Sequence, residues 1–392
     1  MILLRYCAVV LVTVFVTACG GGATSTGSAS SNSTPSANNP SACSATSKFA
    51  YVSNSGSNNI SVLNFNSATG ALTTTTSGTF SPYTSAVNPV SVVIDPTCRF
   101  AYVPSNSSNN ISAYAINSST GALSQIAGSP FVTSTPNSIA IDPTGKYLYV
   151  ANYNSHNVSA YTIDTSTGAL TQITGSPFSV SSVPSTYPSY VAVDPNGRFL
   201  YVVIINYGIS AYSINSTTGA LSLVAGSPFA NGSGSASAGG ITINASGNIA
   251  YVADGNSATV NNVYAYSINA ITGVLTQIVG SPVAAGSYAT SVTIDPTGKF
   301  AYVPNALSNT VSVYTINSLT GVMSQIPGSP FATGTYPTSA SIDPSGSYAY
   351  VSNANGNSIS SYSINITTGA LTPLPSSPFT ATQLYAPWSV TF

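Results

Sequence analysis

The chain has no glutamate, a single histidine and a single tryptophan among 392 residues, and only 3% of its residues are charged. Six Lys or Arg side chains oppose seven Asp, which leaves a formal net charge of −1. Proteins that bind nucleic acid need many cationic contacts to phosphates, and this sequence does not supply them. A polybasic patch that binds a membrane surface is excluded for the same reason.

The scarcity of charge does not indicate disorder. Hydrophobic residues make up 43% of the chain and occur in short runs rich in Val, Ile, Tyr and Phe, the composition of β-strands. The polar surface is therefore left to Ser, Thr, Asn and Gly. Such a surface suits an exported protein whose contacts depend on hydrogen bonding and stacking.

The N-terminus has the pattern of an export signal. Arg5 is the only early charge, and the apolar run from Ala8 to Val16 is too short to cross a bilayer as a mature helix. The run ends in Val16-Thr17-Ala18-Cys19, which resembles a bacterial lipobox. The resemblance implies a lipoprotein signal peptide over residues 1–18 and lipidation of Cys19. The alternative is an ordinary signal cleaved after Ala18.

The residues after Cys19 suggest where the protein is anchored and how. Gly20 rather than Asp follows the cysteine, which by resemblance to enteric lipoproteins favours the outer membrane. The segment to Ser47 is rich in Gly, Ser, Thr and Asn, so residues 19–47 are expected to form a flexible tether with a reach of roughly 30 Å. We therefore expect an exported protein, lipid-anchored to the outer membrane on its periplasmic side or at the cell surface.

Four cysteines are present. Cys7 leaves with the signal peptide and Cys19 is the expected lipidation site, so Cys43 and Cys98 remain. In an oxidising compartment such an isolated pair can form a disulfide. Cys98 occupies a turn position that is Gly in other copies of the repeat described next, and Cys43 precedes the first core strand. The open alternative is two unpaired thiols.

The sequence is built on one repeating unit, exemplified by Asp142 to Phe178. Its Tyr-Val pair recurs seven times, at spacings of 47 to 52 residues, beginning at Tyr51, Tyr102, Tyr149, Tyr201, Tyr251, Tyr302 and Tyr350. A period of this length predicts an array of similar supersecondary units. An uninterrupted repeat also favours one large domain over two.

Each unit contains four strand-like runs, which in this copy are residues 138–141, 147–150, 158–163 and 169–173. Asp142-Pro143-Thr144-Gly145 joins the first two, with the residue types that a tight hairpin turn requires. The strands carry apolar side chains on both faces, so each sheet is expected to pack against two neighbours. Four-stranded sheets stacked around an axis form a β-propeller. The recurring Gly-Ser-Pro, in this copy residues 175–177, suits an outer edge strand.

The two ends of the array predict how the ring closes. Residues 48–52 correspond to a second strand without its first, and residues 387–392 correspond to a first strand with nothing after it. Six complete first strands lie between them. We therefore predict an all-β domain over residues 48–392, a seven-bladed propeller of four-stranded blades in which the C-terminal strand joins the N-terminal blade.

The Tyr-Val-x-Asn runs across residues 48–392 resemble those of YVTN-repeat and lactonase-like propellers. This group includes 6-phosphogluconolactonase-type enzymes and surface-layer repeat proteins. The resemblance implies the same seven-bladed fold and raises lactone hydrolysis as a possible activity. It does not fix the chemistry, because one propeller fold hosts many functions.

Few residues are available for catalysis. Five of the seven Asp residues precede Pro in the first hairpin turn, and Asp164 stands where other repeats place a turn Asn. His156 and Asp254, both in loops between second and third strands, remain as candidates, the alternative being two polar loop residues. No metal site is expected, because one spare carboxylate cannot form a ligand cluster. No Gly-x-Ser-x-Gly motif in a strand-turn-helix context is present, and no cofactor is implied.

The cations are expected at the wrong end for an enzyme that recognises a phosphorylated sugar. Phosphate binding calls for Arg or Lys at the mouth of the site. Every cation of the propeller except Lys48 maps to a first hairpin turn, on the rim opposite the loops that hold His156 and Asp254, and Lys48 enters at that same opposite rim.

Aromatic residues recur in the connections that precede the first strands. They are expected to form a neutral stacking surface on one rim, suited to a glycan or a protein. These candidate ligand-binding residues are Tyr187, Tyr288, Tyr336, Tyr385 and Trp388, with Tyr83 nearby in an earlier connection. The alternative is that the same side chains pack the loops onto the blades.

The sequence therefore favours a non-enzymatic binding or scaffold module of the cell envelope, with a glycan, a small ligand or an envelope protein as its partner. The second hypothesis is a lactonase-type hydrolase that opens a sugar lactone or a related lactone. We expect a monomer that contacts the membrane only through its lipid anchor. A subunit of a larger envelope assembly is the third possibility.

Overall fold

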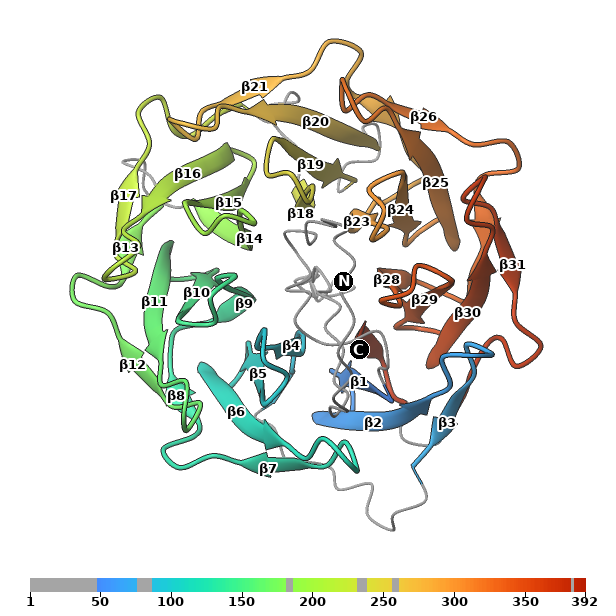
Figure 1. Ribbon diagram of the computed structural model, residues 1–392, viewed down its shortest axis with the longest axis horizontal. Coiled ribbons are helices and arrows are strands. Elements are labelled where there is room, and N and C mark those ends of the chain that lie inside the picture. Colours follow the sequence, from blue (N-terminus) through green and yellow to red (C-terminus); the bar gives the residue numbers. More distant parts are fainter. Residues whose placement is uncertain (1–47, 76–86, 181–185, 231–237, 256–260, 382–383) are drawn as a thin grey trace, which may run out of the picture.

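Seven similar β-sheets surround one central axis in the computed structural model, which describes residues 48–75, 87–180, 186–230, 238–255, 261–381 and 384–392 (Figure 1). Each sheet is one blade, numbered from the N-terminus. No helix occurs within these ranges. The predicted all-β, seven-bladed fold is confirmed.

Each of blades 1 to 4 extends from an innermost strand at the axis to short strands at its outer edge. From the inside outward, blade 1 contains β32 (Pro387–Thr391), β1 (Phe49–Asn54), β2 (Asn59–Phe65) and β3 (Leu72–Thr74). Blade 2 contains β4 (Val93–Ile94), β5 (Phe100–Ser105), β6 (Asn110–Ile116), β7 (Leu123–Gln125) and β8 (Phe131–Val132). Blade 3 contains β9 (Pro136–Ile141), β10 (Tyr147–Asn152), β11 (Asn157–Ile163), β12 (Leu170–Gln172) and β13 (Phe178–Ser179). Blade 4 contains β14 (Tyr187–Val193), β15 (Phe199–Ile205), β16 (Gly208–Ile214) and β17 (Leu221–Leu223).

Blades 5 to 7 follow the same order. Blade 5 contains β18 (Ala238–Ile243), β19 (Ile249–Asp254), β20 (Asn262–Ile268), β21 (Leu275–Gln277) and β22 (Val283–Ala284). Blade 6 contains β23 (Thr293–Ile294), β24 (Phe300–Asn305), β25 (Thr310–Ile316), β26 (Met323–Gln325) and β27 (Phe331–Ala332). Blade 7 contains β28 (Pro337–Ile342), β29 (Tyr348–Asn353), β30 (Ser358–Ile364) and β31 (Leu371–Pro373).

Four blades differ from the predicted four strands by a short fifth one. In blade 3, Ser176-Pro177 forms a cis turn after β12, and β13 then pairs with the opposite end of β11. Blades 2, 5 and 6 do the same with β8, β22 and β27. The Gly-Ser-Pro motif therefore divides the outer edge of the blade into two short pairings, where the sequence predicted only the end of a strand.

The ring closes as predicted, with β32 antiparallel to β1 and Val390 opposite Val52. The last residue, Phe392, is fully buried, with its ring 4.8 Å from the rings of both Phe65 and Tyr350. Blade 1 therefore combines the two ends of the described chain, and its innermost strand, β32, packs against blade 7.

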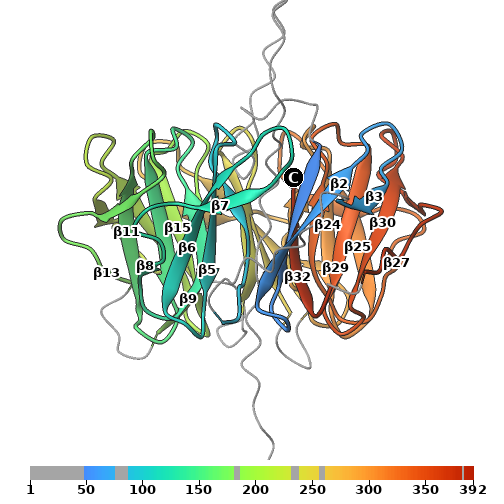
Figure 2. The same cartoon turned by 90° about the horizontal axis from the view of Figure 1, so that it is seen from below.

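Two rims result from the antiparallel order and are easiest to see from the side (Figure 2). The turns that join the first to the second strand and the third to the fourth lie on one rim, which we call the turn rim. The loops between second and third strands and the connections between blades lie on the other, which we call the loop rim. The turn rim is fixed locally: in blade 3, Asp142 Oδ1 accepts hydrogen bonds from the backbone N–H groups of Lys146 (2.8 Å) and Tyr147 (2.7 Å).

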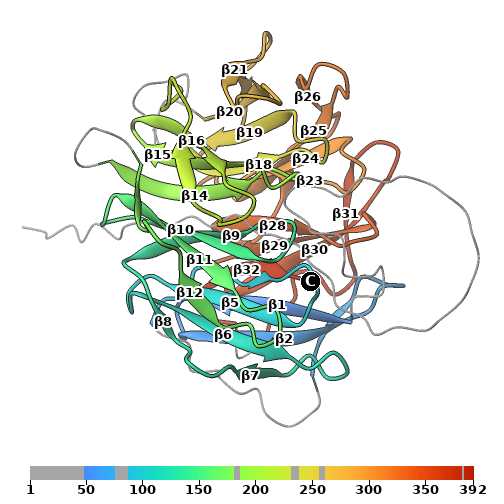
Figure 3. The ribbon, with the colours of Figure 1, turned by 60° about the vertical axis from the view of Figure 1, so that its left-hand side comes forward.

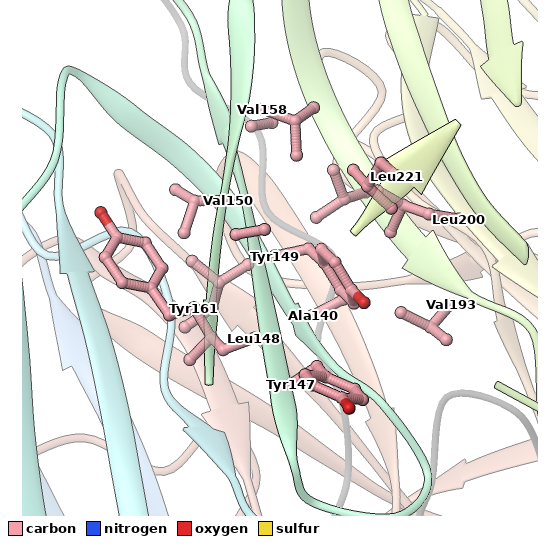
Figure 4. Packing of buried hydrophobic residues seen from close by; sticks show 14 of the residues in the cluster. Ala140, Tyr147, Leu148, Tyr149, Val150, Val158, Tyr161, Val193, Leu200 and Leu221 are labelled. Atoms are coloured by element: carbon pink, nitrogen blue, oxygen red, sulfur yellow. The ribbon is translucent and has the colours of Figure 1, made fainter. Parts of the chain in front are cut away.

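The core lies between neighbouring blades. Figure 4 shows one such layer, in which Tyr147 and Tyr149 of blade 3 lie on the side of Val193, Leu200 and Leu221 of blade 4. Leu148 and Val150 lie on the opposite face of blade 3. Tyr149 Oη also donates a hydrogen bond of 3.0 Å to the carbonyl oxygen of Gly219 in the next blade. The Tyr of every Tyr-Val pair makes this bond, with the acceptors Gly121, Gly168, Gly219, Gly273, Gly321, Gly369 and Gly70 in order around the ring.

The expectations for the segment before the propeller remain predictions. Residues 1–47, with the expected signal peptide, Cys19 and Cys43, lie outside the described residues. Cys98 lies in the β4–β5 turn with φ 59 and is disulfide-bonded, and its expected pairing with Cys43 remains a prediction. In the part of the chain that the structure covers, no helix meets the length and hydropathy needed to span a bilayer.

Candidate functional site

The described cations all lie on the turn rim. Arg99 Nη2 donates to the carbonyl oxygen of Thr165 in the next blade, and Arg198 Nη1 donates to that of Ala270 at 2.7 Å. Lys146 and Lys299 occupy the same turn in their own blades, and the carbonyl oxygen of Lys48 accepts a hydrogen bond from the N–H of Phe65 at the turn-rim end of β2. The predicted placement of the cations opposite the loops agrees with this arrangement.

The turn-rim carboxylates have framework roles. Asp142, Asp95, Asp194, Asp295 and Asp343 are almost fully buried, and each accepts backbone hydrogen bonds within its own turn. Asp164 accepts from the N–H groups of Ser166 (2.8 Å) and Thr167 (3.1 Å), and these bonds lower the pKa of its carboxyl group. Asparagine makes the same contacts in the other blades, so Asp164 is a turn residue, as its position in the repeat indicated.

His156 bridges blades 3 and 4 at the loop rim. Its Nδ1 lies 2.7 Å from the carbonyl oxygen of Thr186, and because a carbonyl only accepts, Nδ1 carries the proton. In the neutral ring Nε2 then keeps its lone pair. His156 has φ 57°, and its counterparts Asn109 and Asn309 have the same angle within a few degrees. The side chains of these two asparagines accept hydrogen bonds from the N–H groups of Thr135 and Tyr336 in the connections that follow. His156 thus replaces an asparagine that links successive blades.

Asp254 also occupies an asparagine position of the repeat. It ends β19, is fully buried, and corresponds in register to Asn305, whose Nδ2 donates to Ser312 Oγ at 2.9 Å. In blade 5 the serine of that pair is replaced by Tyr264. His156 and Asp254 belong to blades 3 and 5, and each has a counterpart in the framework of other blades, which favours framework roles for both. The expected loop position of Asp254 is wrong, because this residue ends a strand and is buried. Among the described residues, no three metal-ligating side chains form a cluster.

The predicted aromatic residues lie on the loop rim in three separate groups. The Tyr187 ring lies 5.0 Å from Tyr153 and 4.9 Å from His156, between blades 3 and 4. The Tyr288 and Tyr336 rings are 6.2 Å apart, at blades 6 and 7. Tyr385 is 58% exposed at blade 1. The structure brings Tyr288 and Tyr336 together and keeps Tyr187 and Tyr385 apart from them.

Trp388 and Tyr83 complete the predicted set. Trp388 is half-buried on β32, the innermost strand of blade 1, and its carbonyl oxygen accepts a hydrogen bond of 3.0 Å from Thr338 Oγ1 in blade 7. Tyr83 lies outside the described residues.

Tyr288 and Tyr336 are held in a conformation that tyrosine rarely adopts. Their φ angles are 64° and 59°, in the left-handed region, where a side chain costs energy. Asn88, Thr135 and Ala386 occupy the same place before the innermost strands of blades 2, 3 and 1, with φ between 47° and 64°. The backbone shape is therefore a property of the repeat, and blades 6 and 7 use it to hold tyrosines at the loop rim.

Sequence reasoning missed Tyr190, which is 1% exposed on β14. Burial raises the pKa of its hydroxyl well above the usual value, and the nearby Tyr288 and Tyr336 add to that shift. Tyr190 stands where other blades have a serine, as at Ser138 and Ser339. Comparing the innermost strands position by position is the signal that could have revealed it.

Blade 5, which packs against blade 4, has two glycines on its innermost strand. Figure 3 shows β18 between β14 and β23. Near its start β18 carries Gly239 and Gly240, in the part of the strand that corresponds to Tyr190 on β14. A Cβ at Gly239 would come within 2.5 Å of the carbonyl oxygen of Thr290, and the N–H of Gly240 donates to that same oxygen at 2.9 Å. The two glycines therefore let β18 lie close to the segment that precedes β23 in blade 6.

The sequence matches the family model described as "Lactonase, 7-bladed beta-propeller" over residues 40–184 and 240–385. Among curated proteins, none matches the sequence. Solved structures share the fold at low identity. A candidate 6-phosphogluconolactonase from Bacteroides uniformis has a TM-score of 0.74 at 21% identity, over 87% of this chain and 98% of that one. A periplasmic gluconolactonase from Pseudomonas aeruginosa has a TM-score of 0.71 at 17% identity, over 87% and 98%.

The same architecture also occurs in a protein with another chemistry. Hydrazine synthase from Kuenenia stuttgartiensis has a TM-score of 0.60 at 17% identity, over 82% of this chain and 94% of that one. Likeness at this level shows a common fold, and the site of this chain has to be judged from its own residues.

Proposed function

This chain belongs to the seven-bladed lactonase family, and from that premise we propose that it is a binding propeller of the cell envelope, anchored through Cys19, that recognises a neutral, hydroxyl-rich ligand at its loop rim. A glycan or a sugar lactone is such a ligand. The proposal places the ligand site among the loops in which the seven copies differ and assigns the Tyr-Val framework to stability.

One observation carries the proposal: tyrosines gather on the loop rim, while every described cation lies on the turn rim. Tyrosine offers a large apolar face for stacking and a hydroxyl for hydrogen bonding, and it loses little conformational entropy on binding. A sugar ring presents apolar C–H faces and hydroxyl edges, which match those groups. An anionic ligand would meet no fixed positive charge among the described loop-rim residues.

Lactone hydrolysis is the second candidate, favoured by the family and by His156. The proton on Nδ1 leaves Nε2 of His156 free to accept a proton from an attacking water. With the cations on the turn rim, the lactone would be one without a phosphate, because phosphate recognition relies on Arg or Lys.

The discriminating experiment uses the full-length chain with a panel of neutral glycans and lactones. Thermal shift reports binding, and base consumption at constant pH reports hydrolysis. We expect a neutral sugar to raise the melting temperature and no lactone to be opened faster than in buffer. Lys146→Gln, on the turn rim, is the control and should bind as the unaltered chain does.

Hydrolysis that His156→Ala abolishes would establish the enzyme instead. Asn109→Ala is the matched control for that variant, because Asn109 makes the equivalent link in blade 2 and its loss should leave the activity unchanged. If no member of the panel binds or reacts, the proposal of a neutral-ligand site fails.

A further inference from the structure

Three consecutive blades expose an aliphatic side chain at the turn between their third and fourth strands. We call these residues the aliphatic tips: Ile271 in blade 5, Leu319 in blade 6 and Ile366 in blade 7, which are 90%, 92% and 69% exposed. The three turns belong to the turn rim and lie at the outer part of their blades, where β20, β25 and β30 are followed by β21, β26 and β31 (Figure 1). Three large apolar side chains are therefore left in solvent on one rim.

The turns form without these side chains. In blade 6, Asn317 Oδ1 accepts hydrogen bonds from the N–H groups of Leu319 and Thr320, both at 3.0 Å. In blade 2, Asn117 makes the equivalent pair of bonds around Ser119. In blades 2, 3 and 4 only Ser and Thr stand between the first residue of this turn and its glycine. Polar residues therefore suffice for the turn, and the aliphatic tips have no part in forming it.

The aliphatic tips occupy matching places in their blades. The third and fourth strands pair in the same register in all three blades, ending with Ile268 opposite Leu275 in blade 5 and with the corresponding residues in blades 6 and 7. A single exposed aliphatic residue is common on soluble proteins and needs no explanation. Three at the same turn of neighbouring blades suit a partner that is broad and apolar, because such a partner can meet all three at once.

The exposed charges beside the aliphatic tips are positive. Arg198 and Lys299 are exposed on the turn rim of blades 4 and 6, and Arg198 Nη1 donates to the carbonyl oxygen of Ala270, the residue before Ile271. The aspartates in the first hairpin turns of blades 4, 6 and 7 are buried and accept backbone hydrogen bonds. Within the described residues, the turn rim of blades 5 to 7 therefore exposes no carboxylate.

The chain also enters the propeller at the turn rim. The carbonyl oxygen of Lys48, the first described residue, accepts a hydrogen bond from Phe65 at the turn-rim end of β2. Residues 19–47 precede it, and a flexible segment of that length has a reach of roughly 30 Å. A lipid on Cys19 would therefore keep the turn rim close to the bilayer. At such a high local concentration, contacts too weak to bind a membrane alone become effective.

We infer that the aliphatic tips insert into the surface of a phospholipid bilayer and hold the propeller with its turn rim on the membrane. The inference rests on the anchoring at Cys19 in the proposed function, and it adds a second contact to the lipid anchor, which the sequence led us to expect as the only one. The aliphatic side chains enter the boundary between head groups and acyl chains, and Arg198 and Lys299 extend to the lipid phosphates. The loop rim, with the proposed ligand site, then faces away from the membrane.

The test places a tryptophan at one aliphatic tip of the full-length chain. Leu319→Trp is mixed with vesicles of phosphatidylcholine and phosphatidylglycerol in equal amounts, with or without bromine on the acyl chains, because bromine quenches a tryptophan that reaches it. The signal of Trp388 is subtracted by using the unaltered chain. We expect bromine to remove at least about half of the emission that the new tryptophan contributes, because apolar side chains at an interface reach the acyl boundary.

Leu307→Trp is the matched control. Leu307 is 64% exposed in the loop between β24 and β25, so it places the same substitution on the same blade but at the loop rim. Its emission should be almost unaffected by bromine. Equal quenching of Leu319→Trp and Leu307→Trp would overturn the inference, because the propeller would then have no preferred face on the membrane.

A second variant tests whether the other two tips contribute. Adding Ile271→Ser and Ile366→Ser to Leu319→Trp gives these turns the residue type of blades 2 to 4. Quenching should fall at least about twofold, because membrane binding scales with the apolar area inserted. The melting temperature should not change, because both side chains are exposed. Unchanged quenching would contradict a joint role for the three residues.

Further outcomes separate the inference from the proposed function. If the unaltered chain floats with vesicles but Leu319→Trp is not quenched, the inference falls and the anchoring stands. If Leu319→Trp is quenched although mass spectrometry finds no lipid on Cys19, the inference stands and the anchoring falls, and if the chain neither floats nor is quenched, both fall. Emission of Leu319→Trp that is at short wavelength without vesicles and shifts on dilution would identify a second copy of the chain as the partner of the tips, and would overturn the inference.

Discussion

The hydroxyl of Tyr350 in blade 7 donates a hydrogen bond of 2.6 Å to the carbonyl oxygen of Gly70 in blade 1, 280 residues earlier in the chain. Six other tyrosines make the corresponding bond to the following blade. The Tyr of the Tyr-Val signature is therefore a tie between neighbouring blades, and its contact is made with the turn at the outer part of the next sheet.

Tyr350→Phe removes this tie without leaving a large cavity. We expect the free energy of unfolding to fall by about 1 kcal/mol, the usual net value of one hydrogen bond, with the Gly70 carbonyl left unpaired as part of the loss. Urea denaturation measures it. Tyr385→Phe, at an exposed site, is the control, and an equal loss there would contradict the assigned role.

The closing strand provides a larger effect. Phe392 is fully buried against Phe65 and Tyr350, so Phe392→Ala should lower the free energy of unfolding by about 3–5 kcal/mol. Deletion of Pro387 to Phe392 should lower the melting temperature more, because it exposes the inner edge of β1. A truncated chain that melts like the complete one would refute closure by β32.

The Asp-Pro turns give a graded pair of variants. Asp142 accepts hydrogen bonds from Thr144, Lys146 and Tyr147, and Asp142→Ala should cost about 2–4 kcal/mol because several buried donors lose their partner. Asp142→Asn should cost less, because Asn244 fills the same place in blade 5 and accepts from Asn248 and Ile249. Equal losses in the two variants would show that the charge, rather than the acceptor, holds the turn.

Stability should fall steeply in alkaline solution. Burial raises the pKa of many tyrosines, including Tyr149, Tyr251 and Tyr350, above the ordinary value near 10. In the unfolded chain these groups ionise near pH 10, and in the folded chain they stay protonated. The stabilisation is therefore complete below pH 10 and is lost above it, by up to about 1.4 kcal/mol per pH unit for each such group.

Melting temperatures between pH 8 and pH 11 measure this loss. The alkaline limb should be less steep in Tyr149→Phe, which has one group fewer to ionise. Identical slopes in the variant and the unaltered chain would contradict the assignment of the effect to buried tyrosines.

Digestion without reduction tests the expected pairing of Cys43 with Cys98. Mass spectrometry should find one linked peptide pair that separates on reduction, and Cys98→Ser should yield a chain without it. A free thiol at Cys43 in the unaltered chain would rule out the pairing.

Much of the fold was predictable because its causes are local. The Asp-Pro-x-Gly turn at Asp142 and the apolar run along residues 147–150 depend on near neighbours in the chain, and a count of half-blades at residues 48–52 and 387–392 predicted the closure. The second pairing of β13 with β11 was not predictable, since it depends on the turn formed by Ser176-Pro177 and on space left beside a three-residue strand.

The site was harder to predict because it depends on relations between blades that are distant in sequence. Tyr288 and Tyr336 were identified from their connections, but their contact depends on the positions of two neighbouring blades. Tyr190 looked like one more aromatic residue in a strand. Its neighbours Tyr288 and Tyr336 come from blades about one hundred residues or more further along the chain.

The seven Tyr-to-Gly bonds run in one direction, each from a blade to its successor, and the last returns to the first. An open stack of repeats has two end units that are held on one side only, and they fray first. In this ring each blade both gives and receives a bond, so no unit is an end. The amide hydrogens of the second strands should therefore exchange at similar slow rates in all seven blades. Removing one Tyr-to-Gly bond should speed exchange in both of the blades that it joined.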